Sequence, residues 1–334
     1  MSHDHISIDR NNFSSEEEYQ DELNRLTAET LRISLEQAYF PPHATLKEYE
    51  AVRSLLDDPD SRISGAAKEK LRSYGAKISP VLRTDLRENI ITDPQAITIA
   101  TAVLRSFQRE AIDGLLDMVR ECSEARRDLN LEEMFIGLSQ FGYPETDAEA
   151  LRKGLDDIAL RVHALFMKSQ QHNELGLVLS MNQAFFEESR FSGAADDEYH
   201  HPDNTYAHIV MRRRLGIPIS LCVAYLLVAE RADVGVYGVG MPAHFVVYHP
   251  ELDVFIDAFG KGAFLSRDDC KRFIRDAGFS FEESMLEKSS NIAILLRMIR
   301  NLIFAYTKMQ AEWEVEALHE LSATIIEAMN QEEE

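Results

Sequence analysis

The stretch Gly-Ile-Pro-Ile-Ser-Leu-Cys at 216–222 decides the fold, together with Pro-Ala-His-Phe-Val-Val-Tyr at 242–248 and Val-Phe-Ile-Asp-Ala-Phe at 254–259. The three stretches place a hydroxyl or thiol residue at a helix start, a histidine on one strand and an aspartate on the next. This is the order of a nucleophile, a general base and the residue that orients the base. The sequence therefore predicts the layout of an acyl-transfer site.

Secondary structure around these stretches follows from the residues themselves. Pro218 suits the first turn of a helix, and the segment from Ile219 to Ala232 is apolar almost all round, which is typical of a buried helix. Strands are predicted at 236–239, 244–249 and 254–259, with a turn at His249-Pro-Glu-Leu.

The second hairpin predicts a contact between His244 and Asp257. A turn symmetric about the Pro250–Glu251 bond puts these two residues directly opposite each other, on one face of the sheet. A register shift of two residues leaves them diagonal neighbours on that face, whereas a shift of one separates them.

Two residues compete for the place of the nucleophile. Ser220 and Cys222 are two positions apart, so on a helix their side chains point about 200° away from each other. Only one of them can face His244. A helix start favours a thiolate, whereas a serine hydroxyl needs a neighbouring base. We expect Ser220 to occupy the nucleophile position and Cys222 to be a buried core thiol, with Cys222 kept as the alternative nucleophile.

Long motifs resemble the bacterial SirB-type family of the transglutaminase-like superfamily. They are Asn182, Phe185-Phe-Glu-Glu188, Phe191-Ser-Gly193, Tyr199, Pro202-Asp-Asn-Thr-Tyr206, Arg212-Arg-Arg-Leu-Gly-Ile-Pro-Ile-Ser220, Gly238-Val-Gly-Met-Pro-Ala-His244 and Ile256-Asp257. The resemblance implies catalytic positions at Ser220, His244 and Asp257. The superfamily has a cysteine where this chain has Ser220, and SirB-type proteins often lack it. His201 and His208 stand where the family pattern has Asp and Asn.

The resemblance also implies the architecture. We expect an α+β, predominantly helical chain with a small transglutaminase-like (papain-like) core and an antiparallel sheet, flanked by helical regions. The expected parts are a disordered tail at 1–14, a helical N-terminal region at 15–168 with a HEAT-like hairpin at about 50–88, the core at 169–285, and tetratricopeptide-like helices at 286–330.

Further cleft candidates are Asn182, His201, Asn204 and Arg213. His200, His201 and His208 could ligate a metal, but their spacing matches no closed zinc pattern, so we expect no metal and no cofactor. Arg212-Arg-Arg214 could bind an anion, although ion pairing within so acidic a chain is the favoured reading.

The charge and the cysteine content of the chain indicate which kinds of partner it can bind and where it is located. The chain has 35 basic and 57 acidic residues and a formal charge of −22, which argues against nucleic acid or an anionic membrane as partner. Its three cysteines have no paired spacing, and neither an export signal nor a membrane-length apolar run is recognisable. We therefore expect a cytoplasmic protein with a protein or peptide partner, and the sequence leaves the oligomeric state open.

Two functions follow from these observations. The first is a binding or regulatory module that lacks the catalytic thiol and recognises a peptide or protein. The alternative is an amide or ester hydrolase or acyltransferase in which Ser220 attacks, His244 takes the proton and Asp257 orients the imidazole.

Overall fold

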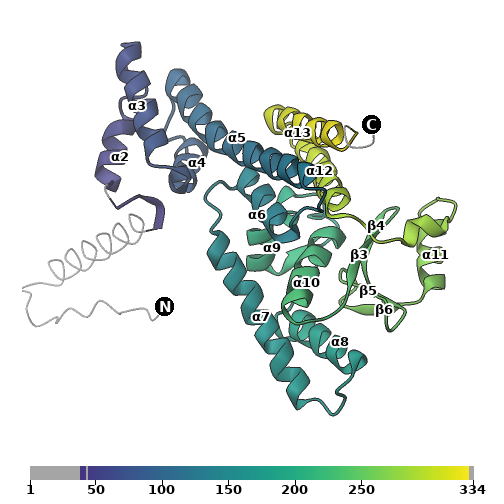
Figure 1. Ribbon diagram of the computed structural model, residues 1–334. Helices are drawn as coiled ribbons and strands as arrows, with labels where there is room; N and C mark the ends of the chain where they lie inside the picture. The colour runs from purple at the N-terminus through teal and green to yellow at the C-terminus, as the bar shows by residue number, and fades with distance from the viewer. Residues whose placement is uncertain (1–37, 43, 331–334) are drawn as a thin grey trace, which may run out of the picture. The chain divides into compact units, whose positions relative to one another are not determined.

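The computed structural model describes residues 38–42 and 44–330 (Figure 1). The predicted tail at 1–14 lies outside the described residues. The chain divides into two compact units. One unit contains the chain up to Arg109 together with 143–145, and the other contains 110–142 and the chain from Thr146 onward.

The first unit is helical. Its helices are α2 (Leu46–Arg53), α3 (Ser61–Ser73), the short 3-10 turn η2 (Ala76–Ile78), α4 (Ser79–Arg87) and the first part of α5 (Pro94–Glu124). Thr45 and Glu48 cap α2 reciprocally, because each side chain bonds the other residue's backbone N–H. A core of buried apolar residues, including Tyr49, Leu71 and Leu82, holds these helices together. Whether the segment at 50–88 is HEAT-like stays a prediction.

The second unit contains the stretches that decide the fold. Its helical elements before the sheet are the end of α5, α6 (Leu131–Gly142), α7 (Ala148–Lys168), α8 (Glu174–Asn182), the π-helical turn η3 (Gln183–Glu188), η4 (Pro202–Asn204), α9 (Ala207–Arg213) and α10 (Pro218–Arg231). Every residue of α10 from Pro218 to Ala229 is buried, as its apolar sequence predicts.

The sheet is antiparallel and has four strands in the order β3-β4-β5-β6. They are β3 (Tyr237–Met241), β4 (His244–His249), β5 (Val254–Asp257) and β6 (Ala263–Leu265). A separate parallel pair, β1 (Ser192–Gly193) with β2 (Leu215–Gly216), was not predicted.

Two helices cover opposite faces of this sheet. Helix α10 packs on β3 and β4 from one side, and α11 (Arg267–Asp276) lies on the other (Figure 1). On the α11 side, Val246 of β4 and Phe255 of β5 form one apolar cluster with Cys270 and Ile274 of α11. Because side chains alternate along a strand, the residues of β4 and β5 divide cleanly between the two faces.

After α11 the chain continues through the 3-10 turn η5 (Glu283–Leu286) into α12 (Asn291–Lys308) and α13 (Glu312–Asn330), which pack against each other. Their tetratricopeptide-like character and the boundary at 286 stay predictions. Among the described residues, no helix combines the length and the apolar character needed to span a membrane.

The predicted fold class is confirmed, because the chain is mainly helical and has a small antiparallel sheet. The predicted helix after Pro218 is present at the expected place. The strand bounds differ: β3 extends to Met241 because it pairs with β4 up to the Pro242–Ala243 turn, and β5 ends at Asp257 rather than Phe259.

Candidate functional site

His244 and Asp257 are hydrogen-bonded. Nε2 of His244 lies 3.0 Å from Oδ1 of Asp257, and both residues are buried. The same carboxylate oxygen accepts the backbone N–H of Phe259 at 3.0 Å. Burial opposes ionisation of Asp257, but the bonds from His244 and from the N–H groups of Gly260 and Phe259 outweigh it and lower the pKa of Asp257. An ionised carboxylate can only accept, so the shared proton lies on Nε2 of His244 and leaves Nδ1 for other chemistry.

The predicted contact is therefore present, but the predicted register was wrong by two residues. The pairs are His249 with Val254 and Val247 with Ile256, which makes the loop four residues long. A two-residue loop that begins with proline and forms a type II turn has a positive φ at its second residue, as Ala243 has in the preceding hairpin. Here that residue would be Glu251. The longer loop gives the positive φ, 49°, to Asp253 instead, and aspartate tolerates it better.

The histidine ring lies on the sheet face that α11 covers. Met241, directly opposite His244, and Val246, two residues further along, both belong to the cluster around α11. Phe273 of α11 stacks on the imidazole, with ring centroids 4.7 Å apart and planes at 16°. Phe259 meets the same ring edge-on at 6.5 Å. Two aromatic rings therefore contact the imidazole.

Ser220 does not have the exposed hydroxyl that a nucleophile requires. It is fully buried in the first turn of α10, and its hydroxyl lies 2.5 Å from the carbonyl oxygen of Asn204. The hydroxyl oxygen of Ser220 also accepts the backbone N–H of Ile217 at 3.1 Å. Within the described chain, none of the hydrogen bonds of Ser220 reaches His244 or Asp257. The hydroxyl thus caps the helix and ties it to the preceding loop, and its catalytic role stays a prediction.

Cys222 is a core thiol. It is fully buried, as predicted, and its Sγ lies 3.3 Å from the carbonyl oxygen of Phe245. Burial, with the negative charge of Asp257 as a second cause, raises the pKa of Cys222 far above its usual range. A thiol in this state carries no thiolate at neutral pH. Phe245 and His244 are successive strand residues that face opposite sides of the sheet, so the sulfur and the imidazole are separated by the strand.

The other two cysteines are also buried and unpaired. Cys270 lies in the cluster between α11 and the sheet, where burial raises its pKa to about 11. Cys122 is in α5.

Three of the four cleft candidates lie around one loop. Asn204 is buried under it and donates to the carbonyl oxygens of Glu198 and Tyr199. Arg213 pairs with Glu198 at 2.7 Å and with Asp203 at 3.8 Å. His201 accepts the backbone N–H of Asp203. The arginine therefore forms the internal ion pairs that the sequence favoured.

This loop borders a cavity of about 480 Å³. It is lined by Asp196, Asp197, Glu198, His200, His201, Asp203, Arg213, Ala305, Lys308 and Met309. Of the charged side chains around it, four are acidic and two are basic. Asn182, the fourth candidate, lies elsewhere, between the hydroxyl of Tyr225 and the carbonyl oxygen of Gly262.

The three histidines considered as metal ligands contact different parts of the chain. His200 packs against Phe304, His201 caps the turn at Asp203, and Nδ1 of His208 lies 3.2 Å from the hydroxyl of Thr146. Across 38–42 and 44–330, no set of three or more His, Cys, Asp or Glu side chains is arranged to hold a metal ion.

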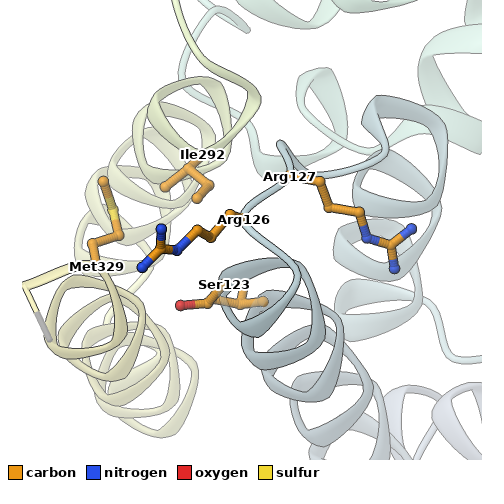
Figure 2. A pocket seen from close by; sticks show the side chains of 6 residues that line it. Ser123, Arg126, Arg127, Ile292 and Met329 are labelled. Atoms are coloured by element: carbon orange, nitrogen blue, oxygen red, sulfur yellow. The ribbon is translucent and has the colours of Figure 1, made fainter. Parts of the chain in front are cut away.

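A second cavity, of about 430 Å³, is lined by Val119, Ser123, Arg126, Arg127, Ile292 and Met329. Figure 2 shows the Arg126 side chain extending toward Ile292 and Met329, whereas Arg127 points away from them. The residues that line this cavity include no histidine or carboxylate that could act as a general base. The His244–Asp257 pair therefore remains the candidate site.

Residues 149–300 match the family model of the transglutaminase-like superfamily. They contain the whole candidate site. A UPF0162 protein of Xylella fastidiosa (strain 9a5c) is 32% identical over 176 residues, which are 49% of this chain and 60% of that protein. A UPF0162 protein of Pseudomonas aeruginosa is 28% identical over 160 residues, 46% of this chain and 56% of that protein. F-box only protein 21 of Homo sapiens is 33% identical over 134 residues, 37% of this chain and 21% of that protein.

The chain thus spans 60% or less of the length of these curated relatives. No solved structure matches it. Residues 149–300 are called the transglutaminase-like region below.

Sequence reasoning missed two residues of this region that hold the histidine in place. Phe273 stacks on the ring, and Arg297 of α12 donates to the carbonyl oxygens of Met241 and His244, each at 2.8 Å. Arg297 could have been noticed as a charged residue inside the apolar pattern Ile-Leu-Leu-Arg-Met-Ile. Phe273 carries no such signal, because an aromatic residue in an amphipathic helix is ordinary.

Proposed function

We propose that the transglutaminase-like region is a SirB-type, non-thiol module that recognises a peptide or protein partner and does not catalyse acyl transfer. The observation that carries this proposal is the state of Ser220. Its hydroxyl stands at the place of the superfamily's cysteine, yet it is fully buried and bonded to the peptide groups of Asn204 and Ile217. A serine without a base within reach is a poor nucleophile.

The alternative is a serine hydrolase or acyltransferase, and one observation favours it. The hydrogen bond between His244 and Asp257 is the one that a base and its orienting residue would make. Binding of substrate would have to release Ser220 from its cap and bring it to Nδ1 of His244. Three buried thiols without a disulfide agree with a reducing, cytoplasmic location under either function.

The cavity of about 480 Å³ beside the loop at 196–203 supports the binding role. It has the size of a ligand pocket. Asp196 and Asp197 form no ion pair in the described structure, while Arg213 is shared between Glu198 and Asp203. The excess of negative charge favours a partner segment that carries lysine or arginine.

Chemical labelling tests the absence of catalysis. The native full chain should react at neither Ser220 with a fluorophosphonate nor Cys222 with iodoacetamide at neutral pH, because both groups are buried and no base activates them. Peptide mapping by mass spectrometry gives the modified residue. Unfolded protein, in which Cys222 should react, and Ser220→Ala serve as controls. Labelling of Ser220 that is abolished by His244→Ala would establish the serine enzyme instead.

Peptide display tests the binding role. A random peptide library selected against the native full chain should yield binders rich in lysine or arginine. Their affinity should fall about 5- to 10-fold for Asp197→Asn, which is the effect of about 1 kcal/mol for one lost charge contact. Asp157→Asn, an exposed aspartate of α7, is the matched control and should leave the affinity unchanged. Binders that are insensitive to Asp197→Asn and to Asp196→Asn would refute this cavity as the recognition site.

A further inference from the structure

Two arginines of the second unit lie near each other without a carboxylate. Arg161 of α7 donates from Nη1 to the hydroxyl of Ser189 at 3.2 Å. Arg214, the residue that ends α9, places its guanidinium 4.7 Å from the centre of the Phe191 ring. Both side chains are half-buried. In the described part of the chain, neither guanidinium has an acidic partner.

Most other half-buried arginines of the same unit have carboxylate partners, and Arg297, which has none in the described structure, donates to two backbone carbonyl oxygens. Arg152 and Arg231 both pair with Glu132, and Arg213 pairs with Glu198. In Arg214, burial and the positive charge of Arg161 lower the pKa, with no carboxylate to counter them. Moreover, its Nη1 is buried without a hydrogen-bond partner. An unpaired buried donor on a charged group is costly, so the resting structure leaves an interaction unmade.

Packing explains only part of this cluster. The Phe191 ring gives Arg214 a cation–π contact, and the carbonyl oxygen of Arg214 accepts the N–H of Ser192 at 2.9 Å. The backbone bond needs no arginine, because any residue supplies a carbonyl. Arg214 also has φ 60°, a conformation in which glycine is the usual residue. Neither contact accounts for the second positive charge of Arg161 close by.

We infer that Arg161, Arg214 and Ser189 form a binding site for a phosphate-type oxyanion. Two guanidinium groups supply paired N–H donors that suit the oxygens of a tetrahedral anion. Ser189 accepts from Arg161, so its own O–H stays available as a further donor. A doubly negative anion between the two arginines would cancel their repulsion, and it would satisfy the buried Nη1 of Arg214 once that side chain shifts toward it. This site is independent of the proposed recognition of peptides.

Thermal unfolding of the native full chain in sodium phosphate tests the inference. The melting temperature should rise by about 3 °C and saturate, as expected for one ligand site on the folded state. Sodium chloride and sodium acetate at the same ionic strength should produce at most half of this rise. Isothermal titration with phosphate should give a stoichiometry near one.

Arginine-to-glutamine variants show which residues cause the rise in melting temperature in phosphate. Arg214→Gln and Arg161→Gln should each lose the response to phosphate while melting within about 3 °C of the native chain without it, because each change also relieves the repulsion. Arg212→Gln, an exposed arginine of the same motif, is the matched control and should keep the response. If Arg214→Gln does not fold, Arg161→Gln carries the test. A rise that equals that in chloride, or that persists in both Arg→Gln variants, would overturn the inference.

Discussion

Asp257→Ala is expected to lower the free energy of unfolding by about 2–4 kcal/mol, because the change leaves a buried imidazole and two backbone N–H groups without their acceptor. Asp257→Asn should cost less, since an amide oxygen can still accept one of these bonds. Denaturant unfolding followed by circular dichroism measures both changes. Asp268→Ala, on the exposed face of α11, is the control and should cost at most about 0.5–1 kcal/mol.

The pH dependence of the same pair has a definite sign. The pKa of Asp257 is lower in the folded chain than in the unfolded chain. Its ionised form therefore contributes stability that is fully present above about pH 4, the ordinary value for aspartate, and that is lost as the pH falls through the lower, folded value. The difference in stability between the native chain and Asp257→Ala should therefore be smaller at pH 2.5 than at pH 5. A difference that is unchanged at pH 2.5 would contradict an ionised Asp257.

The contact between His244 and Asp257 could be predicted because it holds for a register shift of zero or two residues. Strand residues alternate between faces, so any even shift in register keeps both side chains on one face. The shift of two residues that the loop at Pro250 introduces therefore changed the pairing partners but not the contact. The helix after Pro218 could be predicted equally well, since its apolar pattern and its proline are local signals.

The orientation of Ser220 could not be predicted in the same way. Helical spacing shows that Ser220 and Cys222 diverge, but it does not show which of them faces the histidine. That choice depends on Asn204, whose carbonyl oxygen lies 16 residues upstream and takes the serine hydroxyl. Similarly, Phe273 and Arg297 reach His244 from helices that follow the sheet. Long-range contacts of this kind leave no periodic signal in the sequence.

Together these contacts fix His244 in position and cover its ring. Asp257 fixes one nitrogen, Phe273 covers one face of the ring, and Arg297 holds the carbonyl group of the same residue. A general base needs an accessible nitrogen next to its nucleophile, whereas a structural pair needs burial and satisfied bonds. The geometry agrees with the second description, which is why the binding role is proposed first.

Arg297→Met is expected to lower the free energy of unfolding by about 2–4 kcal/mol, because it removes the charge-assisted donors of two carbonyl groups on either side of the Pro242–Ala243 turn. The variant should also increase amide hydrogen exchange in β3 and β4 more than elsewhere, since α12 no longer holds the end of this hairpin. Arg297→Lys should recover only part of the stability, because an ammonium group lacks the fork that reaches both oxygens.

The neighbouring arginine of the same helix provides the control for Arg297. Arg300 is exposed, and its positive charge contributes to the lowered pKa of Arg297, for which burial is the main cause. Arg300→Met should therefore leave the stability unchanged within about 0.5 kcal/mol, or raise it slightly. Equal losses for Arg297→Met and Arg300→Met would show that the helix tolerates no apolar change here and that the two carbonyl bonds are not the cause. A loss confined to Arg297→Met, with faster exchange at Met241 and His244, would mean that α12 holds the histidine strand in position.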